Sequence, residues 1–106
     1  MKTLRAALFC TLMIALPALA QEVRIDIKAF MFTPVELNIA TGTRVTWVND
    51  DDDPHTVVET HKVFHSPALD THDSFSYQFD NPGTFEYFCG LHPQMVGKVV
   101  VGGGGG

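Results

Sequence analysis

The chain has 106 residues, with twelve acidic and seven basic side chains and a formal net charge of −5 at pH 7. This length suits one domain. The acidic balance argues against nucleic acid as a partner, because the phosphates would repel the chain. It favours a partner that presents a positively charged patch.

Residues 1–20 have the layout of a cleaved secretory signal peptide. Lys2 and Arg5 precede an apolar run, and the small residues ALA come just before Gln21. A membrane anchor is the alternative, but the apolar run is short for a span, which needs about 20 residues. We therefore expect cleavage before Gln21 and export to the periplasm, with no membrane insertion of the mature chain.

Alternating apolar residues predict β-strands along most of the remaining chain. In chain order, the strand-like stretches are VRIDIKA, VELNIA, RVTWVN, DSFSYQF, TFEYFC and GKVVV, separated by turn residues. Short strands at this spacing predict an all-β sandwich or barrel. The residues that we expect on inner faces are Val23, Ile25, Ile27, Val35, Leu37, Ile39, Trp47, Phe75, Tyr77, Phe79, Phe85, Tyr87 and Cys89.

Three stretches depart from the alternating pattern. The acidic run from Asp50 to Asp53 resembles a hard-cation site, but it lacks the Gly and the distal Glu of a calcium loop, so we expect a solvated loop. Residues 59–71 are irregular and predict a long connection. The glycines at 102–106 predict a flexible tail, which leaves residues 21–101 as the folded domain.

The strongest functional signal lies near the C-terminus. Cys89, His92 and Met95 follow one another at intervals of three residues. Cys10 lies within the predicted signal peptide, so the mature chain has one cysteine and no internal disulfide. In a sandwich, His55, which Pro54 stiffens from the N-terminal side, can lie beside this segment.

The set of His55, Cys89, His92 and Met95 discriminates between metals. Zinc sites rarely include a thioether, and calcium and magnesium prefer oxygen ligands. Two imidazoles, one thiolate and a weak axial thioether are typical of a blue-copper site. The sequence therefore predicts one copper ion per chain.

The stretches PHTV, SPALDTHDSFSYQFDNPGTFEYFC and CGLHPQM resemble the cupredoxins, the small blue copper proteins. The Cys-x2-His-x2-Met spacing is most similar to that of the amicyanins, one class within this family. The resemblance runs from about Val23 to Val101 and implies a Greek-key β-sandwich of about eight strands, with a type 1 copper at one end. The ligands it implies are His55, Cys89, His92 and Met95.

The residue after the first ligand differs from the usual pattern of the resembled class. Amicyanins typically have Asn at this position, whereas this chain has Thr56. The backbone N–H of Thr56 is expected to reach the sulfur of Cys89.

These observations predict a soluble periplasmic electron carrier rather than an enzyme. We expect a monomer whose partners are redox proteins, with a dehydrogenase or a c-type cytochrome as plausible examples. A copper-trafficking protein is the second hypothesis, although Met-rich and Cys-rich clusters are missing from the sequence. A copper enzyme is the third, and it would need a second metal centre in a larger assembly.

His61, His65 and His72 could form a second surface metal site, but we expect them to be solvated.

Overall fold

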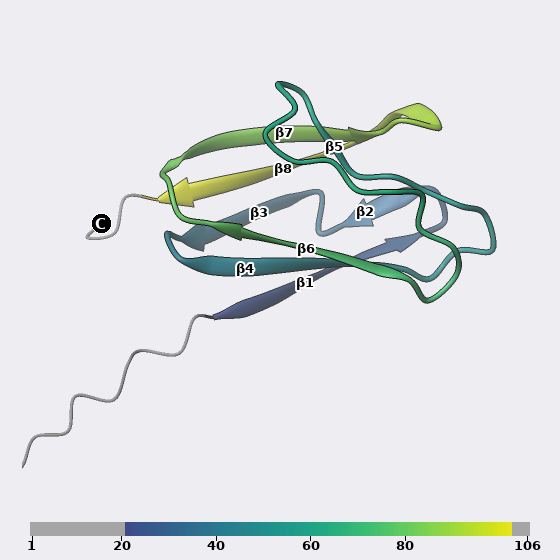
Figure 1. The fold of residues 1–106 in the computed structure, drawn as a ribbon, viewed down its shortest axis with the longest axis horizontal. Coiled ribbons are helices and arrows are strands. Elements are labelled where there is room, and N and C mark those ends of the chain that lie inside the picture. The colour runs from purple at the N-terminus through teal and green to yellow at the C-terminus, as the bar shows by residue number, and fades with distance from the viewer. Residues whose placement is uncertain (1–20, 103–106) are drawn as a thin grey trace, which may run out of the picture.

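The computed structural model describes residues 21–102 and folds them into two four-stranded β-sheets packed face to face (Figure 1). The predicted signal peptide and residues 103–106 lie outside the described residues. The strands are β1 (Glu22–Lys28), β2 (Met31–Thr33), β3 (Glu36–Ala40), β4 (Thr43–Asn49), β5 (Val58–Glu59), β6 (Ser74–Phe79), β7 (Gly83–Cys89) and β8 (His92–Gly102). In this part of the chain, no helix has the length and apolar character needed to cross a membrane.

The strand order places sequence-distant segments side by side. One sheet has the order β2-β1-β4-β6, and the other has the order β3-β8-β7-β5. The β1–β4 and β3–β8 pairs are parallel, whereas the other neighbours are antiparallel. The predicted all-β Greek-key sandwich of about eight strands is confirmed.

The core forms where the apolar alternation of the strands meets between the sheets. Ile25 and Ile27 of β1 are fully buried, and so is Trp47 of β4. The Trp47 ring meets the ring of Tyr87 edge-on, with centroids 5.4 Å apart. Phe64, from the irregular segment, also packs on Trp47. Burial of these rings ties the two sheets and the long connection into one apolar core.

Several residues expected on inner faces are less buried than predicted. Val35 is 56% exposed because it precedes β3, which begins at Glu36. The residues that are only partly buried are Val23, Leu37, Ile39, Phe75, Tyr77 and Phe85. Phe85 packs on Phe79. The alternation thus identified the correct faces but overestimated burial at the margins of the sheets.

Two local features were not predicted. The short strand β2 pairs with β1 through a turn at Ala29 and Phe30, whose φ angles are 53° and 58°. Such two-residue turns usually contain Asn or Gly, so this one had no sequence signal. In addition, β8 begins at His92, which pairs with Cys89 across a tight hairpin. The link between Cys89 and His92 is therefore a strand connection of two residues, Gly90 and Leu91.

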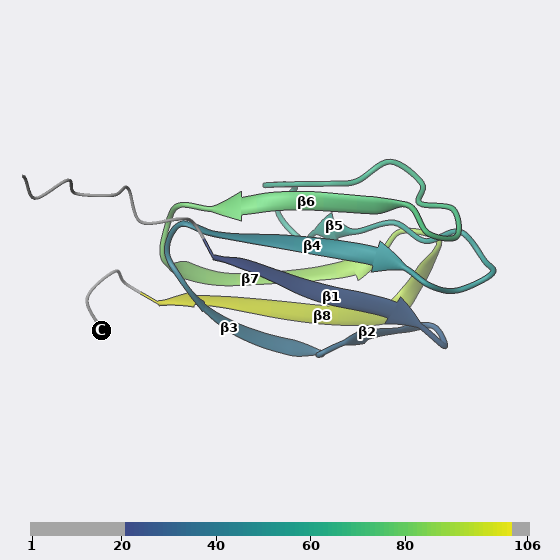
Figure 2. The same ribbon diagram turned by 90° about the horizontal axis from the view of Figure 1, so that it is seen from below.

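One end of the sandwich collects the segments that carry the candidate ligands. β1, β4 and β7 finish at this end, and β2 and β8 start there, opposite the ends at Gln21 and Gly102 (Figure 2). The connection between β4 and β5, which contains the acidic run and His55, lies at the same end. The topology thus assembles the site from three separate parts of the chain.

Candidate metal centre

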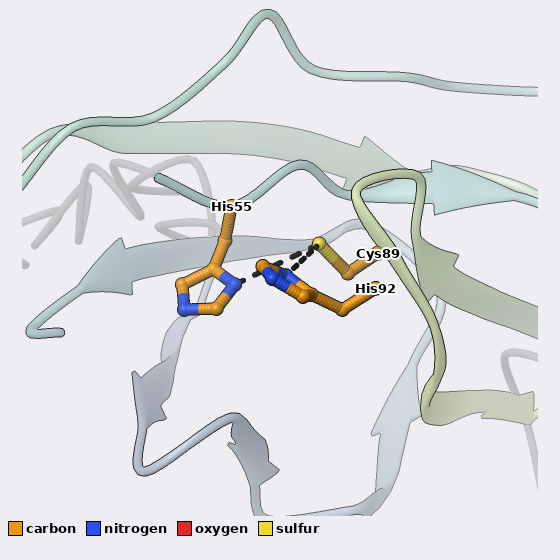
Figure 3. Close-up of side chains that lie close together, drawn as sticks. All are labelled: His55, Cys89 and His92. Atoms are coloured by element: carbon orange, nitrogen blue, oxygen red, sulfur yellow. Dashed lines mark hydrogen bonds between the residues drawn. The ribbon is translucent and has the colours of Figure 1, made fainter. Parts of the chain in front are cut away.

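His55, Cys89 and His92 converge at this end of the sandwich. Their ligating atoms all lie within 4.8 Å of one another. The Cys89 Sγ atom is 3.7 Å from Nδ1 of His55 and 3.7 Å from Nδ1 of His92 (Figure 3). The sequence prediction that His55 would lie beside the Cys89–His92 segment is confirmed by this convergence.

Backbone pairing on both sides holds the three residues in place. His55 and Leu69 form a bridge in which N–H of His55 donates to O of Leu69 at 3.1 Å and N–H of Leu69 donates back at 2.7 Å. Cys89 and His92 face each other across the β7–β8 hairpin. His55 and Cys89 are fully buried, and His92 is partly exposed. The imidazole of His92 is therefore the one in contact with solvent.

Met95 lies in β8, three residues after His92, and is 5% exposed. It belongs to the apolar core cluster. Its place on the hairpin strand that begins with His92 is compatible with a weak axial ligand. The role of Met95 as a fourth ligand stays a prediction.

Thr56 fastens the Cys89 hairpin with two hydrogen bonds. Its backbone N–H donates to Sγ of Cys89 at 3.3 Å, as expected from the sequence. Its hydroxyl oxygen accepts from the backbone N–H of Gly90 at 2.7 Å. Thr56 therefore supplies a side-chain link between the His55 segment and the hairpin although it is not Asn.

The acidic run is not uniformly solvated, which corrects the sequence prediction. Asp52 and Asp53 are exposed, but Asp51 is only 7% exposed. The Asp51 carboxylate accepts from the backbone N–H groups of Ala29 at 2.7 Å and Phe30 at 2.9 Å. It also contacts Nε2 of His55 at 2.9 Å. The charge can be buried because the β1–β2 turn and His55 of its own connection satisfy it.

The charge state of Asp51 decides the tautomer of His55. Burial raises the pKa of Asp51, but hydrogen bonds from the N–H groups of Phe30 and Ala29 and from His55 outweigh it and leave the pKa below its ordinary value. An ionised carboxylate only accepts hydrogen bonds, so Nε2 of His55 must carry the proton. In a neutral imidazole the lone pair is then on Nδ1, the nitrogen that lies beside Sγ of Cys89, as metal binding requires.

Phe30 forms an aromatic wall beside both imidazoles. Its ring meets His55 edge-on at a centroid distance of 5.2 Å and meets His92 edge-on at 4.9 Å. Phe30 is 45% exposed, so it borders the site on a side that is open to solvent. Sequence reasoning missed Phe30 because only the unpredicted β1–β2 turn brings it to the site.

Asn49, at the end of β4, secures the acidic run. Its Nδ2 donates to the backbone carbonyls of Asp53 at 2.9 Å and Leu69 at 2.8 Å. Its Oδ1 accepts from the backbone N–H of Asp51 at 2.9 Å. Because Asn49 is fully buried, these bonds satisfy a polar group that would otherwise destabilise the fold.

The other three histidines lie away from the cluster. His61 is 85% exposed beside Glu59, and His72 is 83% exposed beside Asp50. His65 is exposed on the long connection, where its backbone bridges Val58. Within residues 21–102, no group of three ligating side chains contains any of them.

The chemistry of the converging donors fits copper. A buried cysteine sulfur and two imidazole nitrogens, with a thioether nearby in sequence, match the ligands of a blue-copper site. The backbone donor on the sulfur and the carboxylate behind His55 are the kind of surrounding contacts that orient metal ligands.

Comparison with known proteins agrees with this geometry. Residues 3–101 match the family model of the cupredoxin-like domain. Amicyanin-alpha of Methylorubrum extorquens is 40% identical over 90 residues, which cover 80% of this chain and 74% of that protein. Amicyanin of Paracoccus denitrificans is 34% identical over 82 residues, which cover 73% of this chain and 63% of that protein.

Solved structures show the same likeness. A purple cupredoxin from Nitrosopumilus maritimus superposes with a TM-score of 0.71 and 35% sequence identity, over 76% of this chain and 99% of that one. The family match covers almost the whole described region, and both the sandwich and the His-Cys-His cluster agree with it. The chain belongs to the cupredoxin-like family.

Proposed function

We propose that the chain binds one type 1 copper ion through His55, Cys89, His92 and Met95 and carries single electrons between redox proteins in the periplasm. The observation that carries this proposal is the pair of imidazole Nδ1 atoms, each 3.7 Å from the buried Sγ of Cys89. Family membership supports it, since the solved relatives include an amicyanin variant described in its Cu(I) form.

Copper in such a site supplies a one-electron Cu(II)/Cu(I) couple. The chain contributes ligands that move little. His55 is held by its bridge to Leu69 and by Asp51, and Cys89 is held by the hairpin and by Thr56. Ligands fixed in this way favour electron transfer, because little rearrangement accompanies a change of oxidation state.

The exposed side of the site suggests where electrons leave. His92 is the partly exposed ligand, and Leu91 beside it is 51% exposed. A small apolar surface on an acidic protein suits a weak, transient complex with a basic patch on a partner. We therefore propose a monomeric carrier whose partners are redox proteins such as a dehydrogenase or a c-type cytochrome.

The spectrum of the copper-loaded protein, processed before Gln21, tests the proposal. An intense thiolate-to-copper band is expected, and Cys89→Ser should abolish it because the hydroxyl cannot replace the thiolate. Met95→Gln should retain a coloured site with a lower reduction potential, because an oxygen ligand favours Cu(II). A native spectrum in the Cys89→Ser protein would contradict the ligand assignment.

Electrochemistry separates a carrier from a copper-trafficking protein. A carrier should show reversible one-electron voltammetry and hold its copper against a chelator. Rapid loss of copper to the chelator, without reversible voltammetry, would favour trafficking. A copper enzyme would need a second metal centre, and residues 21–102 contain no second group of three candidate ligands of the kind that His55, Cys89 and His92 form.

A further inference from the structure

The β1–β2 turn adopts an unfavourable backbone conformation next to the site. Ala29 and Phe30 have φ angles of 53° and 58°, and the flanking residues Lys28 and Met31 pair directly. The left-handed region is disfavoured for residues with a side chain, above all for bulky ones. Glycine or asparagine would fit this turn more easily, so the presence of Phe30 calls for a physical reason.

A single carboxylate holds this turn. Oδ1 of Asp51 accepts from N–H of Ala29, and Oδ2 accepts from N–H of Phe30. Oδ2 also lies 2.9 Å from Nε2 of His55. The same planar carboxylate of Asp51 therefore binds both the turn and the imidazole of His55.

Asp51 is itself fixed from its own segment. Its backbone N–H donates to Oδ1 of Asn49, and its backbone carbonyl accepts from the hydroxyl of Thr71 at 2.6 Å. The carboxylate is thus a defined anchor rather than a mobile surface charge.

The left-handed turn directs the Phe30 ring onto the ligands. The ring lies edge-on to His55 and to His92, with interplanar angles of 85° and 89°. Edge-on contacts between rings are orientation-dependent. The turn and its anchor therefore restrain both imidazoles, one by a hydrogen bond and both by ring contacts.

We propose that Asp51 and the turn residues Ala29 and Phe30 form a positioning clamp that orients both ligand imidazoles before the metal binds. The clamp holds His55 as the Nε2–H tautomer and restrains the ring of His92 through Phe30. The proposal rests on the proposed copper function for its purpose, but its geometry is a property of the metal-free chain. Asp51 and Phe30 act through the ligands and are positioning residues.

The first experiment observes the imidazoles directly. Nitrogen NMR of the metal-free protein at about pH 8, above the ordinary histidine pKa of about 6.5, should show His55 as a single Nε2–H tautomer. Asp51→Asn places an amide among three donors, so His55 should lose this uniform tautomer. Asp52→Asn, which removes the same charge from an exposed neighbour, should leave the His55 signals unchanged.

The second experiment measures Cu(I) affinity by competition with a chelator. Loss of a partner that orients a metal ligand typically weakens binding roughly 10- to 100-fold, and we expect this for Asp51→Asn but not for Asp52→Asn.

Phe30→Asn removes the ring while suiting the left-handed turn. It should keep or raise the melting temperature of the metal-free protein, yet broaden the His92 ring signals and weaken Cu(I) binding.

The outcomes separate this proposal from the proposed function. If the wild-type protein binds no copper but Asp51→Asn still changes the His55 tautomer, the copper function fails and the clamp stands. If copper binds and both variants keep wild-type imidazole signals and Cu(I) affinity, the clamp is refuted. If Phe30→Asn lowers the melting temperature without affecting either histidine, the turn is only a structural fastening, which also refutes it.

Discussion

Two buried carboxylates in this protein make nearly the same contacts but have different consequences. Asp51 accepts from two backbone N–H groups and pairs with His55, four residues later. Glu59 accepts from the backbone N–H groups of His61 and Val63 and pairs with the ring of His61. Burial raises the pKa of each, but the hydrogen bonds prevail and leave both pKa values below their ordinary positions.

The difference lies in the histidine and in which nitrogen it uses. His55 is fully buried, and its Nε2 atom forms the hydrogen bond with Asp51. Its Nδ1 atom is therefore left facing the sulfur of Cys89. His61 is 85% exposed and uses Nδ1 for Glu59. A carboxylate–histidine pair therefore does not make a metal site by itself. It contributes to one only when the other nitrogen faces further ligands.

The largest expected difference between the two pairs is in copper binding. His55→Ala should abolish the thiolate-to-copper band, because one of the three converging donors is lost. His61→Ala should bind copper and show the band as in the wild-type protein. Titration with copper, followed by visible absorption, makes the comparison. Equal loss of colour in both variants would show that His61 belongs to the site after all.

The next effect concerns fold stability at the second pair. Glu59→Gln should lower the free energy of unfolding by about 1–2 kcal/mol, because an amide replaces a buried carboxylate that accepts several hydrogen bonds. The spectrum of the copper-loaded protein should not change, since Glu59 does not contact a ligand. Denaturant unfolding of the metal-free protein measures the first quantity. An altered spectrum would show coupling between the two regions that the structure does not predict.

The smallest effect is a change in acid sensitivity. The pKa of Glu59 is lower in the fold than the ordinary value of a glutamate, so its stabilisation is complete above that ordinary value and is lost as pH falls through the folded pKa. Melting temperatures of the metal-free wild-type protein should therefore decline in this acidic window, and those of Glu59→Gln should decline less. Parallel curves for the two proteins would exclude Glu59 as a source of the acid sensitivity.

Strand prediction succeeded where alternation and turn residues agreed. The segments around Ile25, Trp47 and Tyr87 formed the predicted strands with the predicted faces inward. It failed at β2, because the Ala29–Phe30 turn has no turn-forming residue and depends on the hydrogen bonds that its backbone N–H groups donate to Asp51. A local pattern cannot show a turn that is held by a group 21 residues away.

For the site, too, sequence analysis found the features that a local pattern shows and missed those that depend on distant contacts. Cys89 and His92 were found from their spacing, and His55 was added from the expected topology; the structure brings all three together. Asp51 was misassigned to a solvated loop, since four adjacent Asp residues look alike in sequence and only one is buried. The hydrogen bond that the backbone N–H of Gly90 donates to the Thr56 hydroxyl was likewise hidden, because it joins residues 34 apart.

The sequence by itself determined the sandwich and the identity of the donor residues, because alternation of apolar side chains and the chemistry of Cys, His and Met are local properties. Only the tertiary structure decided which Asp is buried, which nitrogen of His55 is free and why Phe30 stands beside both imidazoles. The Asp51–His55 bond spans only four residues, but the bond from Ala29 to Asp51, the contact between His55 and Cys89 and the contact of Phe30 with His92 join segments far apart in the chain. Such contacts exist only after the sheets have packed and brought the ends of β1, β4 and β7 together.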